Sequence, residues 1–450
     1  MYTELFFDDY RLFGREGTHR VYGTPVLLSE YFDPLFSTDY FSPWVFMRGD
    51  SFIMLYMGTR RSDGKCALLA ASSRDGVRFE PLYGPDGRNV VMPLMDAWEP
   101  ITVIEDVNAR AEEKYKLILT KVDRERMCAF AEVYASPDLL SWKLFLSEIP
   151  GWHCEPVGGA FYNTKRDCYT ILHRPTWGNR SAGYCETRDF IHYSDYELCL
   201  HQDALDGALD ELYGMSAFEY AGTVVGFPMM YTRNAPSRKT KYESGSIVPQ
   251  LAYSWDGHHF LRSLRSPFLP DDGEGMSLSW LSQARALPNG DVLLYGAYTP
   301  EAHGEAFRSH QNGRIRVYRL RKDGFIALKT EYDATVVTRE FLYRGGDICI
   351  NLSAEHATMA VVDTCGEDAA QRVWGTDETA PGFDHVDCLP FSGDSTCWTP
   401  RFKQKTLDSL AGRILILEIK YRNGALYSVS GDMEPLGNTQ SARFRKTGSL

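Results

Sequence analysis

The chain has 450 residues, of which 44% are apolar and 13% aromatic, and its formal net charge is −12. This composition excludes a disordered chain and predicts two or three folded domains. The negative charge disfavours nucleic acid and anionic membrane surfaces as partners, and no segment is long and apolar enough to predict a membrane span.

The first residues, "MYTELFFDDYRLFGREG", carry acidic side chains early and contain no long apolar stretch, so we do not expect a secretory signal. The ten cysteines are scattered and form no CxxC pair, which disfavours a zinc ribbon or a thioredoxin-type site. We therefore expect buried free thiols in a reducing compartment, and a cytoplasmic protein. No metal or other cofactor is expected, because no ligand spacing indicates one.

Up to about residue 330, short apolar runs broken by Gly, Asn, Asp and Pro predict strands and turns. One phrase recurs in this part: a strand, a polar residue such as Ser or Thr, an Asp, a turn residue and then an aromatic residue. The Asp of each phrase accepts backbone hydrogen bonds in a hairpin turn, and the aromatic residue packs on the hairpin. The five aspartates, at intervals of 63, 51, 67 and 67 residues, are Asp75, Asp138, Asp189, Asp256 and Asp323.

Each interval also holds an earlier hairpin, so each unit is expected to form a four-stranded antiparallel sheet. Five such units predict a five-bladed β-propeller over residues 1–330, and one large β-sandwich in which the phrase recurs by chance is the alternative. Residues 331–450 alternate apolar and polar side chains with a turn signal about every ten residues, which predicts a C-terminal β-sandwich with a loose tail. The predicted fold class is therefore all-β, a five-bladed β-propeller followed by a C-terminal β-sandwich.

A propeller gathers the first strand of each blade around one axis, so side chains at the starts of these strands are expected to converge. Carboxylates occupy these positions in every blade: Asp39, Asp96 and Glu99, Glu155, Asp210 and Glu211, and Glu274. Two of the acids precede a proline and follow a tryptophan, in "WEP" at 98–100 and "WHCEP" at 152–156, and a proline there marks the first residue of a strand. Solvation, turn capping or a salt bridge would explain any single one of them.

Three carboxylates in one cleft suit the hydrolysis of a glycosidic bond. One acid protonates the leaving oxygen, a second acts as nucleophile or activates water, and a third fixes the sugar ring or tunes its neighbours. The catalytic candidates are Asp39, Glu99 and Glu155, with Glu155 as the general acid. Should Glu155 lie away from the axis, Glu211 or Glu274 would replace it.

The same rim holds residues that suit a sugar, because aromatic faces stack on sugar C–H surfaces while Arg, His and Gln bind hydroxyl groups. Packing within the blade is the alternative for each of them. The candidates for substrate binding are Trp44, Trp98, His173, Arg174, Tyr213, Arg233, Trp280 and Gln283, and Trp177 and Tyr231 lie in the same segments. We therefore expect a carbohydrate as the substrate.

These features resemble those of the five-bladed propeller glycoside hydrolases, families 32, 43, 62 and 68. "WHCEP" is similar to the Trp-Glu-Cys-Pro element that holds the acid/base of family 32, and "WEP" stands where that family has Arg-Asp-Pro, the transition-state stabiliser. Asp39 precedes the first hairpin as the nucleophilic Asp of the family does, and a β-sandwich after the propeller is the family 32 layout. The chain departs from the pattern in that "YFSP" follows Asp39, Glu99 replaces an Asp, and Glu155 lies two residues beyond the expected Glu.

The chain is also similar to an uncharacterised bacterial group of glycosidase-like proteins, in "ELFFDDYRL", "DELYGMSAFEYAG", "LAYSWDGHHF" and "ALYSVSGD". These resemblances imply a glycoside hydrolase. A glycoside phosphorylase on a similar propeller is the first alternative and would need a phosphate site, for which Arg174, Arg180 and Arg233 are candidates. A non-catalytic sugar-binding propeller is the second alternative, and it would hold fewer than two close carboxylates at its centre.

Overall fold

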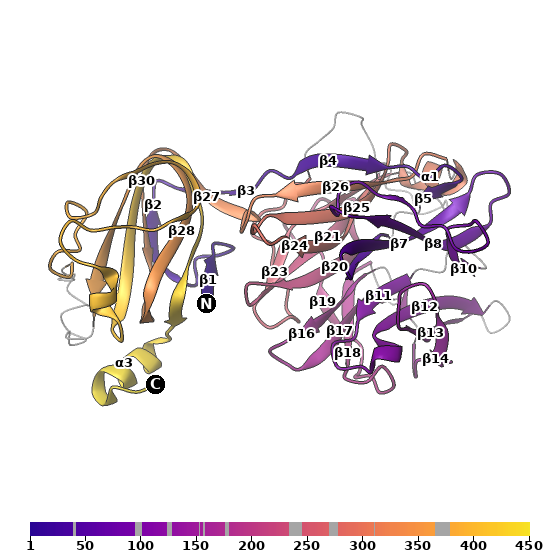
Figure 1. The fold of residues 1–450 in the computed structure, drawn as a ribbon, viewed down its shortest axis with the longest axis horizontal. Coiled ribbons are helices and arrows are strands. Elements are labelled where there is room, and N and C mark those ends of the chain that lie inside the picture. Colours follow the sequence, from indigo (N-terminus) through magenta and orange to yellow (C-terminus); the bar gives the residue numbers. More distant parts are fainter. Residues whose placement is uncertain are drawn as a thin grey trace. The chain divides into compact units, whose positions relative to one another are not determined.

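The computed structural model describes residues 1–38, 42–94, 101–123, 128–152, 154–155, 158–175, 180–233, 245–269, 278–309, 311–364 and 379–450. The chain divides into two compact units, a propeller unit of residues 24–320 and a terminal unit of residues 1–23 and 321–450. The predicted boundary at residue 330 thus lies inside the terminal unit, and residues 1–23, which were expected in the propeller, pair with C-terminal strands. Both units are built almost entirely of strands (Figure 1).

The propeller unit contains five successive antiparallel blades. Blade I consists of β6 (Trp44–Arg48), β7 (Ser51–Arg60), β8 (Cys66–Ser73) and β9 (Glu80–Pro81), with β5 (Phe36–Thr38) and β10 (Val90–Leu94) on its rim. Blade II consists of β11 (Ile101–Glu105), β12 (Tyr115–Asp123), β13 (Cys128–Ser136) and β14 (Lys143–Leu146), with the 3-10 helix η1 (Ala111–Glu113). Blade III consists of β15 (Cys154–Glu155), β16 (Ala160–Asn163), β17 (Cys168–Pro175), β18 (Ala182–Thr187) and β19 (Glu197–Leu200).

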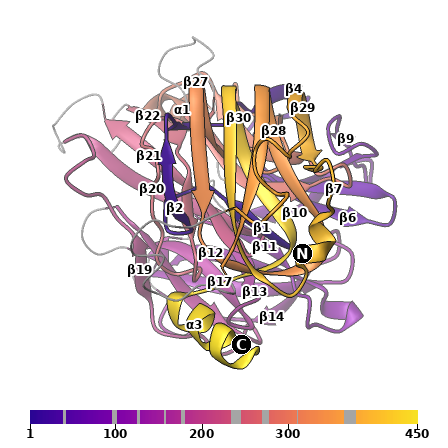
Figure 2. The same cartoon turned by 90° about the vertical axis from the view of Figure 1, so that its left-hand side faces the viewer.

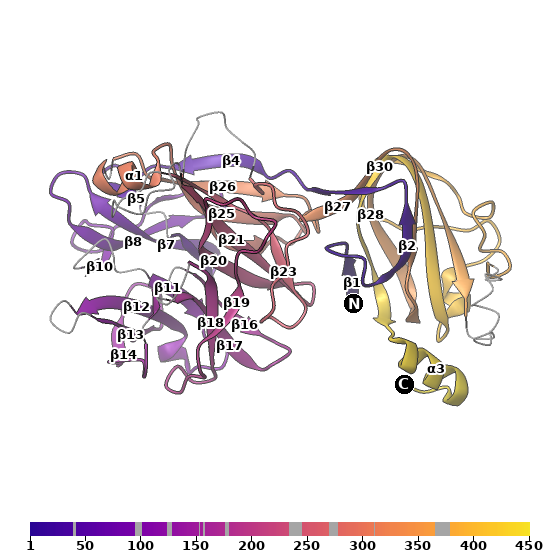
Figure 3. The same ribbon diagram turned by 180° about the vertical axis from the view of Figure 1, so that it is seen from behind.

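Blades IV and V share one continuous sheet, joined through a single residue pair, Ile247 and Leu278. Blade IV consists of β20 (Asp210–Tyr220), β21 (Thr223–Arg233), β22 (Gly245–Pro249) and β23 (Ala252–Ser254). Blade V consists of β24 (Leu278–Ala286), β25 (Val292–Thr299), β26 (Arg314–Leu320) and β4 (Val26–Tyr31), with helix α1 (His303–Ser309) after β25. Its outer strand β4 therefore comes from the start of the chain and lies alongside β26 (Figure 3).

The middle strands of the blades are buried on both faces, which explains their continuous apolar runs. Residues 52–59 of β7 and residues 223–231 of β21 are all buried. A strand covered on both sides needs apolar side chains at every position, because either face would otherwise bury an unsatisfied polar group. The core between blades I and II includes Trp44, Ile101 and Tyr115.

The innermost strands also contact one another around the ring. The Thr102 hydroxyl of blade II donates to the carbonyl of Gly158, which lies between β15 and β16 of blade III, and Gly158 forms a bridge with Met215 of blade IV. A Cβ atom at Gly158 would lie 2.5 Å from the carbonyl oxygen of Leu172, so only glycine fits where the chain passes so close to its neighbour. Farther along the ring, Ser216 of blade IV donates to the carbonyl of Leu281 in blade V.

Four of the five Asp phrases form the same turn, directly after β8, β13, β18 and β23. In each turn, one Asp oxygen accepts the N–H groups two and three residues later, as Asp75 does from Val77 and Arg78 at 2.8 and 2.9 Å. The preceding Ser or Thr hydroxyl accepts the N–H of the residue after the Asp. The equivalent contacts are made by Asp138 with Ser136, Asp189 with Thr187, and Asp256 with Ser254.

Asp323 does not occupy a fifth turn of this kind. It belongs to the terminal unit, where its buried carboxylate accepts a hydrogen bond from Ser428 at 2.6 Å. The outer strand of blade V is β4, so the chain leaves the propeller after β26 instead of forming an outer hairpin. The expectation that Asp323 lies on the outer hairpin of blade V is therefore wrong.

The terminal unit is a strongly bent sheet with the order β2–β27–β30–β28–β29 (Figure 2). Its strands are β1 (Tyr2–Leu5), β2 (Leu12–Glu16), β3 (His19–Tyr22), β27 (Ile326–Thr338), β28 (Phe341–Asp363), β29 (Phe391–Trp398) and β30 (Ile414–Pro435). Phe341 lies opposite both Leu415 and Pro435, so the two ends of β30 meet at the start of β28 and the sheet folds back on itself. The 3-10 helix η2 (Leu407–Leu410) precedes β30.

Two expectations for this part of the chain need correction. The last residues are not a loose tail, because helix α3 (Asn438–Thr447) packs Phe444 against buried Leu342 and Leu436. Not all cysteines are free either, because Cys349 of β28 and Cys397 of β29 form a disulfide. The argument from free thiols to a reducing compartment is weakened accordingly. In the parts of the chain that the structure describes, no helix is long and apolar enough to cross a membrane.

Candidate active site

A cluster of charged and aromatic side chains lies at one end of the propeller, where β17, β21 and β25 finish and β20 and β24 begin. We call this end the site end. The antiparallel pairing of β20 with β21 sets Glu211 opposite Tyr231, and blade III supplies arginines from β17 and from the residues before β18. We call the set the Glu211 cluster, and its members are Arg174, Arg180, Glu211, Tyr213, Tyr231, Arg233 and His303.

Glu211 is the buried carboxylate of this cluster, with 7% of its surface exposed. Arg180 donates to one of its oxygens, and the Arg233 Nε lies 3.7 Å from the other. Burial lowers the pKa of Arg180, but the hydrogen bond and charge of Glu211 outweigh this effect, so the pKa stands above its ordinary value. Two guanidinium groups from different blades therefore hold the carboxylate in one orientation.

Aromatic rings form the other half of the cluster. The Tyr213 hydroxyl lies 2.9 Å from the His303 Nε2, and the Tyr231 ring centroid lies 5.0 Å from that of His303. The Arg174 guanidinium lies 4.5 Å from the Tyr213 ring centroid and donates to the Tyr213 carbonyl at 3.2 Å. Arg180 also lies over both tyrosine rings. The cluster thus combines guanidinium groups, an imidazole and phenol rings from three blades at one end of the propeller.

The backbone of Glu155 belongs to the same end. The two-residue strand β15 pairs with β17, with Glu155 opposite Arg174 and Cys154 opposite Pro175. Directly opposed residues of an antiparallel pair have Cα atoms about 4.5–5.5 Å apart, so the backbone of Glu155 lies beside that of Arg174, a member of the Glu211 cluster. The orientation of that side chain lies outside the described part of the structure. Other predicted residues that lie outside the described residues are Asp39, Asp96, Trp98, Glu99, Trp177 and Glu274.

The remaining predicted substrate-binding residues are divided between the site and the core. Arg174, Tyr213 and Arg233 join the Glu211 cluster as expected for neighbours of the axis. Trp44 instead lies 4% exposed in the core between blades I and II. Gln283 uses its side-chain oxygen to accept the N–H of Val45, which links blade V to blade I.

His173 and Trp280 are also almost completely buried, with 1% of their surface exposed. The His173 ring packs edge-on against Trp152 and Tyr196, with centroids 6.1 and 5.3 Å apart. Packing of this kind favours the alternative interpretation given to these residues, in which they stabilise the blade.

Sequence reasoning missed His303. It belongs to α1 in the connection after β25, a position with no repeat counterpart in the other blades, so no pattern in the sequence predicts it. Its position in the chain could have indicated it, because His303 follows β25, a strand that ends at the site end. Within the described residues, no group of three or more His, Cys, Asp or Glu side chains is placed to hold a metal ion.

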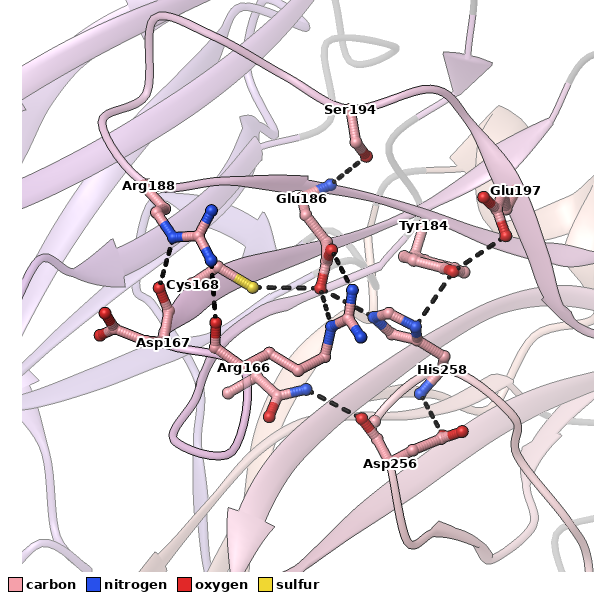
Figure 4. A network of polar contacts seen from close by, with 12 residues as sticks. Arg166, Asp167, Cys168, Tyr184, Glu186, Arg188, Ser194, Glu197, Asp256 and His258 are labelled. Atoms are coloured by element: carbon pink, nitrogen blue, oxygen red, sulfur yellow. Dashed lines mark hydrogen bonds and ion pairs between the residues drawn. The ribbon is translucent and has the colours of Figure 1, made fainter.

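A second arginine–carboxylate network lies at the start of β17 (Figure 4). Glu186 accepts two hydrogen bonds from Arg166, at 2.7 and 2.9 Å, and one from the Cys168 thiol at 3.0 Å. The His258 Nε2 of blade IV lies 2.8 Å from the same carboxylate, and its ring stacks on Tyr184 with centroids 4.3 Å apart. We call these five residues the Glu186 network, and it joins blade III to blade IV.

No protein-family model matches the chain, and no curated protein matches it in sequence. Solved structures do match this chain in the course of the backbone. A thermostable family-43 glycoside hydrolase is 12% identical, with a TM-score of 0.45, over 69% of this chain and 96% of that chain. A glycosyl hydrolase from Bacteroides ovatus is 14% identical, with a TM-score of 0.44, over 70% and 94%.

A third match is a protein of the GH130 family of mannoside phosphorylases, which contains glycoside hydrolases that target β-1,2 mannosidic linkages in Candida mannan. It is 14% identical, with a TM-score of 0.44, over 69% of this chain and 95% of that chain. Each match is a likeness to part of this chain, and none of them supplies a function for it.

Proposed function

We propose that the chain is a glycosidase that hydrolyses a glycosidic bond at the site end of the propeller, in the manner of families 32 and 43, which its sequence resembles. The observation that carries the proposal is the backbone pairing of Glu155 with Arg174, which brings strand β15 next to a member of the Glu211 cluster. Hydrolysis needs an acid and a second carboxylate around one bond, and in our proposal Glu155 is the acid and the second carboxylate comes from Asp39 or Glu99.

In this proposal Glu155 gives its proton to the leaving oxygen as the bond from that oxygen to the anomeric carbon breaks. Asp39 and Glu99 are its companions, one as nucleophile or base for the attacking water and one as stabiliser of the positive charge on the ring. The attacking water supplies a hydroxyl group to the anomeric carbon of the product sugar. The other proton of that water goes to a carboxylate. Glu211 is held by Arg180 and Arg233, so we assign it to positioning the substrate instead of to proton transfer.

A glycoside phosphorylase is the second candidate, and the Glu211 cluster is the observation that favours it. Arg174, Arg180 and Arg233 converge with His303, and guanidinium forks match the geometry of phosphate. In this reaction inorganic phosphate replaces water as the attacking group, so the product is a sugar phosphate.

A screen of aryl glycosides and short oligosaccharides, with and without inorganic phosphate, separates the two reactions. A hydrolase releases free sugar at a rate that phosphate does not raise, whereas a phosphorylase depends on phosphate and yields a sugar phosphate. Absence of turnover on every substrate, together with saturable sugar binding, would favour a non-catalytic propeller and contradict both candidates.

The general acid is tested by Glu155→Gln, which keeps the shape of the side chain and removes the proton. We expect activity to fall about 10²–10⁴-fold, while a substrate with a good leaving group loses less because its departure needs less protonation. The matched control is Glu148→Gln, an exposed carboxylate of the same connection between blades II and III, which should keep full activity. Full activity of Glu155→Gln would transfer the acid role to another carboxylate.

A further inference from the structure

We propose that the terminal unit contains a second binding site, which takes a single neutral sugar ring. The site is a cavity of about 330 Å³ between β1, the corner that joins β27 to β28, and the start of α3. Small-molecule sites in proteins span about 300–1,000 Å³, so this cavity fits a ligand at the small end of that range. It belongs to a different unit from the Glu211 cluster and is independent of the reaction proposed there.

The lining of the cavity combines apolar and polar side chains. Phe341, Val429 and Met433 are among the apolar residues, and Tyr2 and Glu4 are among the polar ones. This combination is typical of sites that bind a ring with an apolar face and polar edges, because apolar side chains cover C–H groups while a few polar groups fix orientation. A pyranose ring has both kinds of surface.

Glu4 is the main polar residue in the lining of the cavity. Alternation along β1 puts Tyr2 and Glu4 on the same side of the strand, and the Tyr2 hydroxyl donates to the Glu4 carboxylate. Glu4 is only 7% exposed, and the Arg11 Nε lies 3.7 Å from its Oε2. Burial raises the pKa of Glu4 to about 7, although the Tyr2 hydrogen bond and the Arg11 charge oppose the rise.

A carboxyl group with such a pKa is available near neutral pH both as an acceptor and as a donor of hydrogen bonds. Sugar hydroxyl groups also donate and accept, so they match Glu4 in either protonation state. Gln440 of α3 also lines the cavity; its side-chain oxygen accepts the N–H of Gly437 at 2.8 Å, and its NH₂ group is a further donor.

The charges of the lining favour a neutral ligand. Two acidic residues, Glu4 and Glu340, and two basic residues, Arg11 and Arg339, line the cavity. A ligand with one charge would therefore meet lining groups of like sign as well as groups of opposite sign. Tyr10 also lines the cavity and is 67% exposed, which provides an aromatic face against which a sugar ring can stack.

The experiment measures the binding of methyl pyranosides of glucose, galactose and mannose to the full chain by saturation-transfer NMR. Glucosamine and glucuronate serve as cationic and anionic counterparts of the same size. The measurements are made in an Arg180→Ala background, which disables the Glu211 cluster and leaves the terminal unit unchanged. We expect at least one neutral methyl pyranoside to bind saturably, and more tightly than either charged sugar.

Two variants locate the site. Glu4→Ala and Tyr10→Ala should each weaken that binding about tenfold or more, because each removes a contact to the ligand. Tyr10 is largely exposed, so Tyr10→Ala remains informative if Glu4→Ala fails to fold. The control is Glu434→Ala on β30, which removes a carboxylate that pairs with Arg344 outside the cavity and should leave binding unchanged.

Absence of saturable binding by every neutral methyl pyranoside would overturn the proposal. So would a preference for glucosamine or glucuronate, or unchanged binding in both Glu4→Ala and Tyr10→Ala. Loss of the glycosidase activity proposed for the propeller would not affect any of these outcomes, because they are read from binding in a variant whose propeller site is disabled.

Discussion

Strand β17 carries two arginine–carboxylate clusters, one at each end. Cys168, at its start, belongs to the Glu186 network, and Arg174, near its end, belongs to the Glu211 cluster. The two residues are six positions apart, or about 20 Å along an extended strand. Similar groups thus occur at opposite ends of one blade, yet their surroundings differ in a way that separates a structural role from a functional one.

The Glu186 network joins blades III and IV and includes His258 of the Asp256 turn. Arg166 occupies both carboxylate oxygens in a bidentate pair, and His258 reaches across from the turn of Asp256. The Glu211 cluster draws residues from three blades to the end where the inner strands start, and Glu155 pairs into it. A bidentate, two-blade arrangement stabilises the fold, whereas a convergence of several blades on one end is what a ligand site requires.

The largest difference is expected in activity. Glu211→Gln should lower kcat/KM about 100-fold, because the amide cannot hold Arg180 and Arg233 in place around the substrate. Glu186→Gln, the same change at the other end of β17, should alter kcat/KM less than about threefold. Steady-state kinetics on the best aryl glycoside, with circular dichroism to confirm folding, would check both. Equal activity losses in the two variants would remove the functional distinction between the clusters.

The second-largest effect is expected in the unfolding free energy, which Glu186→Gln should lower by an amount that depends on pH. Burial raises the pKa of Glu186, but the hydrogen bonds from Arg166, Cys168 and His258 outweigh it and bring the pKa to about 2. A carboxylate with a lowered pKa in the folded state stabilises the protein above its ordinary pKa, and the stabilisation is lost as the pH falls toward 2. We expect Glu186→Gln to cost about 1–2 kcal/mol of unfolding free energy at pH 7, since the pair is partly exposed.

Urea unfolding at pH 7, 5 and 3 measures this cost. The difference in unfolding free energy between the wild type and Glu186→Gln should be constant from pH 7 to 5 and should become smaller at pH 3. A difference in unfolding free energy that increases as the pH falls would show that the Glu186 carboxylate does not stabilise blades III and IV in its charged form.

The blades could be predicted from the sequence because their signal is local. Each Asp turn is specified within a few residues, from the Ser or Thr before the Asp to the N–H groups it caps, so the phrase and the structure coincide four times. The closing of blade V could not be predicted in the same way. Its outer strand β4 comes from the start of the propeller unit and pairs with β26 at the end of that unit. No local sequence pattern indicates a pairing between segments so far apart in the chain.

The site was predictable to the extent that strand ends determine it. Arg174, Glu211 and Arg233 lie at the starts or ends of strands and therefore meet at the site end, as the propeller geometry requires. Trp44 and Gln283 lie equally near the axis, but they pack and link blades. Sequence position gives the distance of a residue from the axis, whereas its burial depends on neighbours from other blades, so the two kinds of residue look alike in the sequence.

The smallest effect concerns the Asp turn of blade II. Burial raises the pKa of Asp138, but the backbone N–H groups of Ser141 and Leu140 and the Ser136 hydroxyl hold it below its ordinary value. The same turn holds Leu139, whose N–H donates to the Ser136 hydroxyl; this residue is fully buried and has a φ of +71°, a backbone conformation that most residues avoid. Asp138→Ala should therefore lower the unfolding free energy by about 0.5–1 kcal/mol.

Asp138→Asn is the matched control, because its side-chain oxygen can still accept the two N–H groups, and it should recover most of the loss. Activity should be unchanged in both variants, since the turn lies at the opposite end of the blade from the Glu211 cluster. Thermal unfolding together with kinetics on the aryl glycoside would check this. A loss of activity without a loss of stability in Asp138→Ala would mean that the two ends of the propeller are coupled, and that the contrast between a structural and a functional end does not hold.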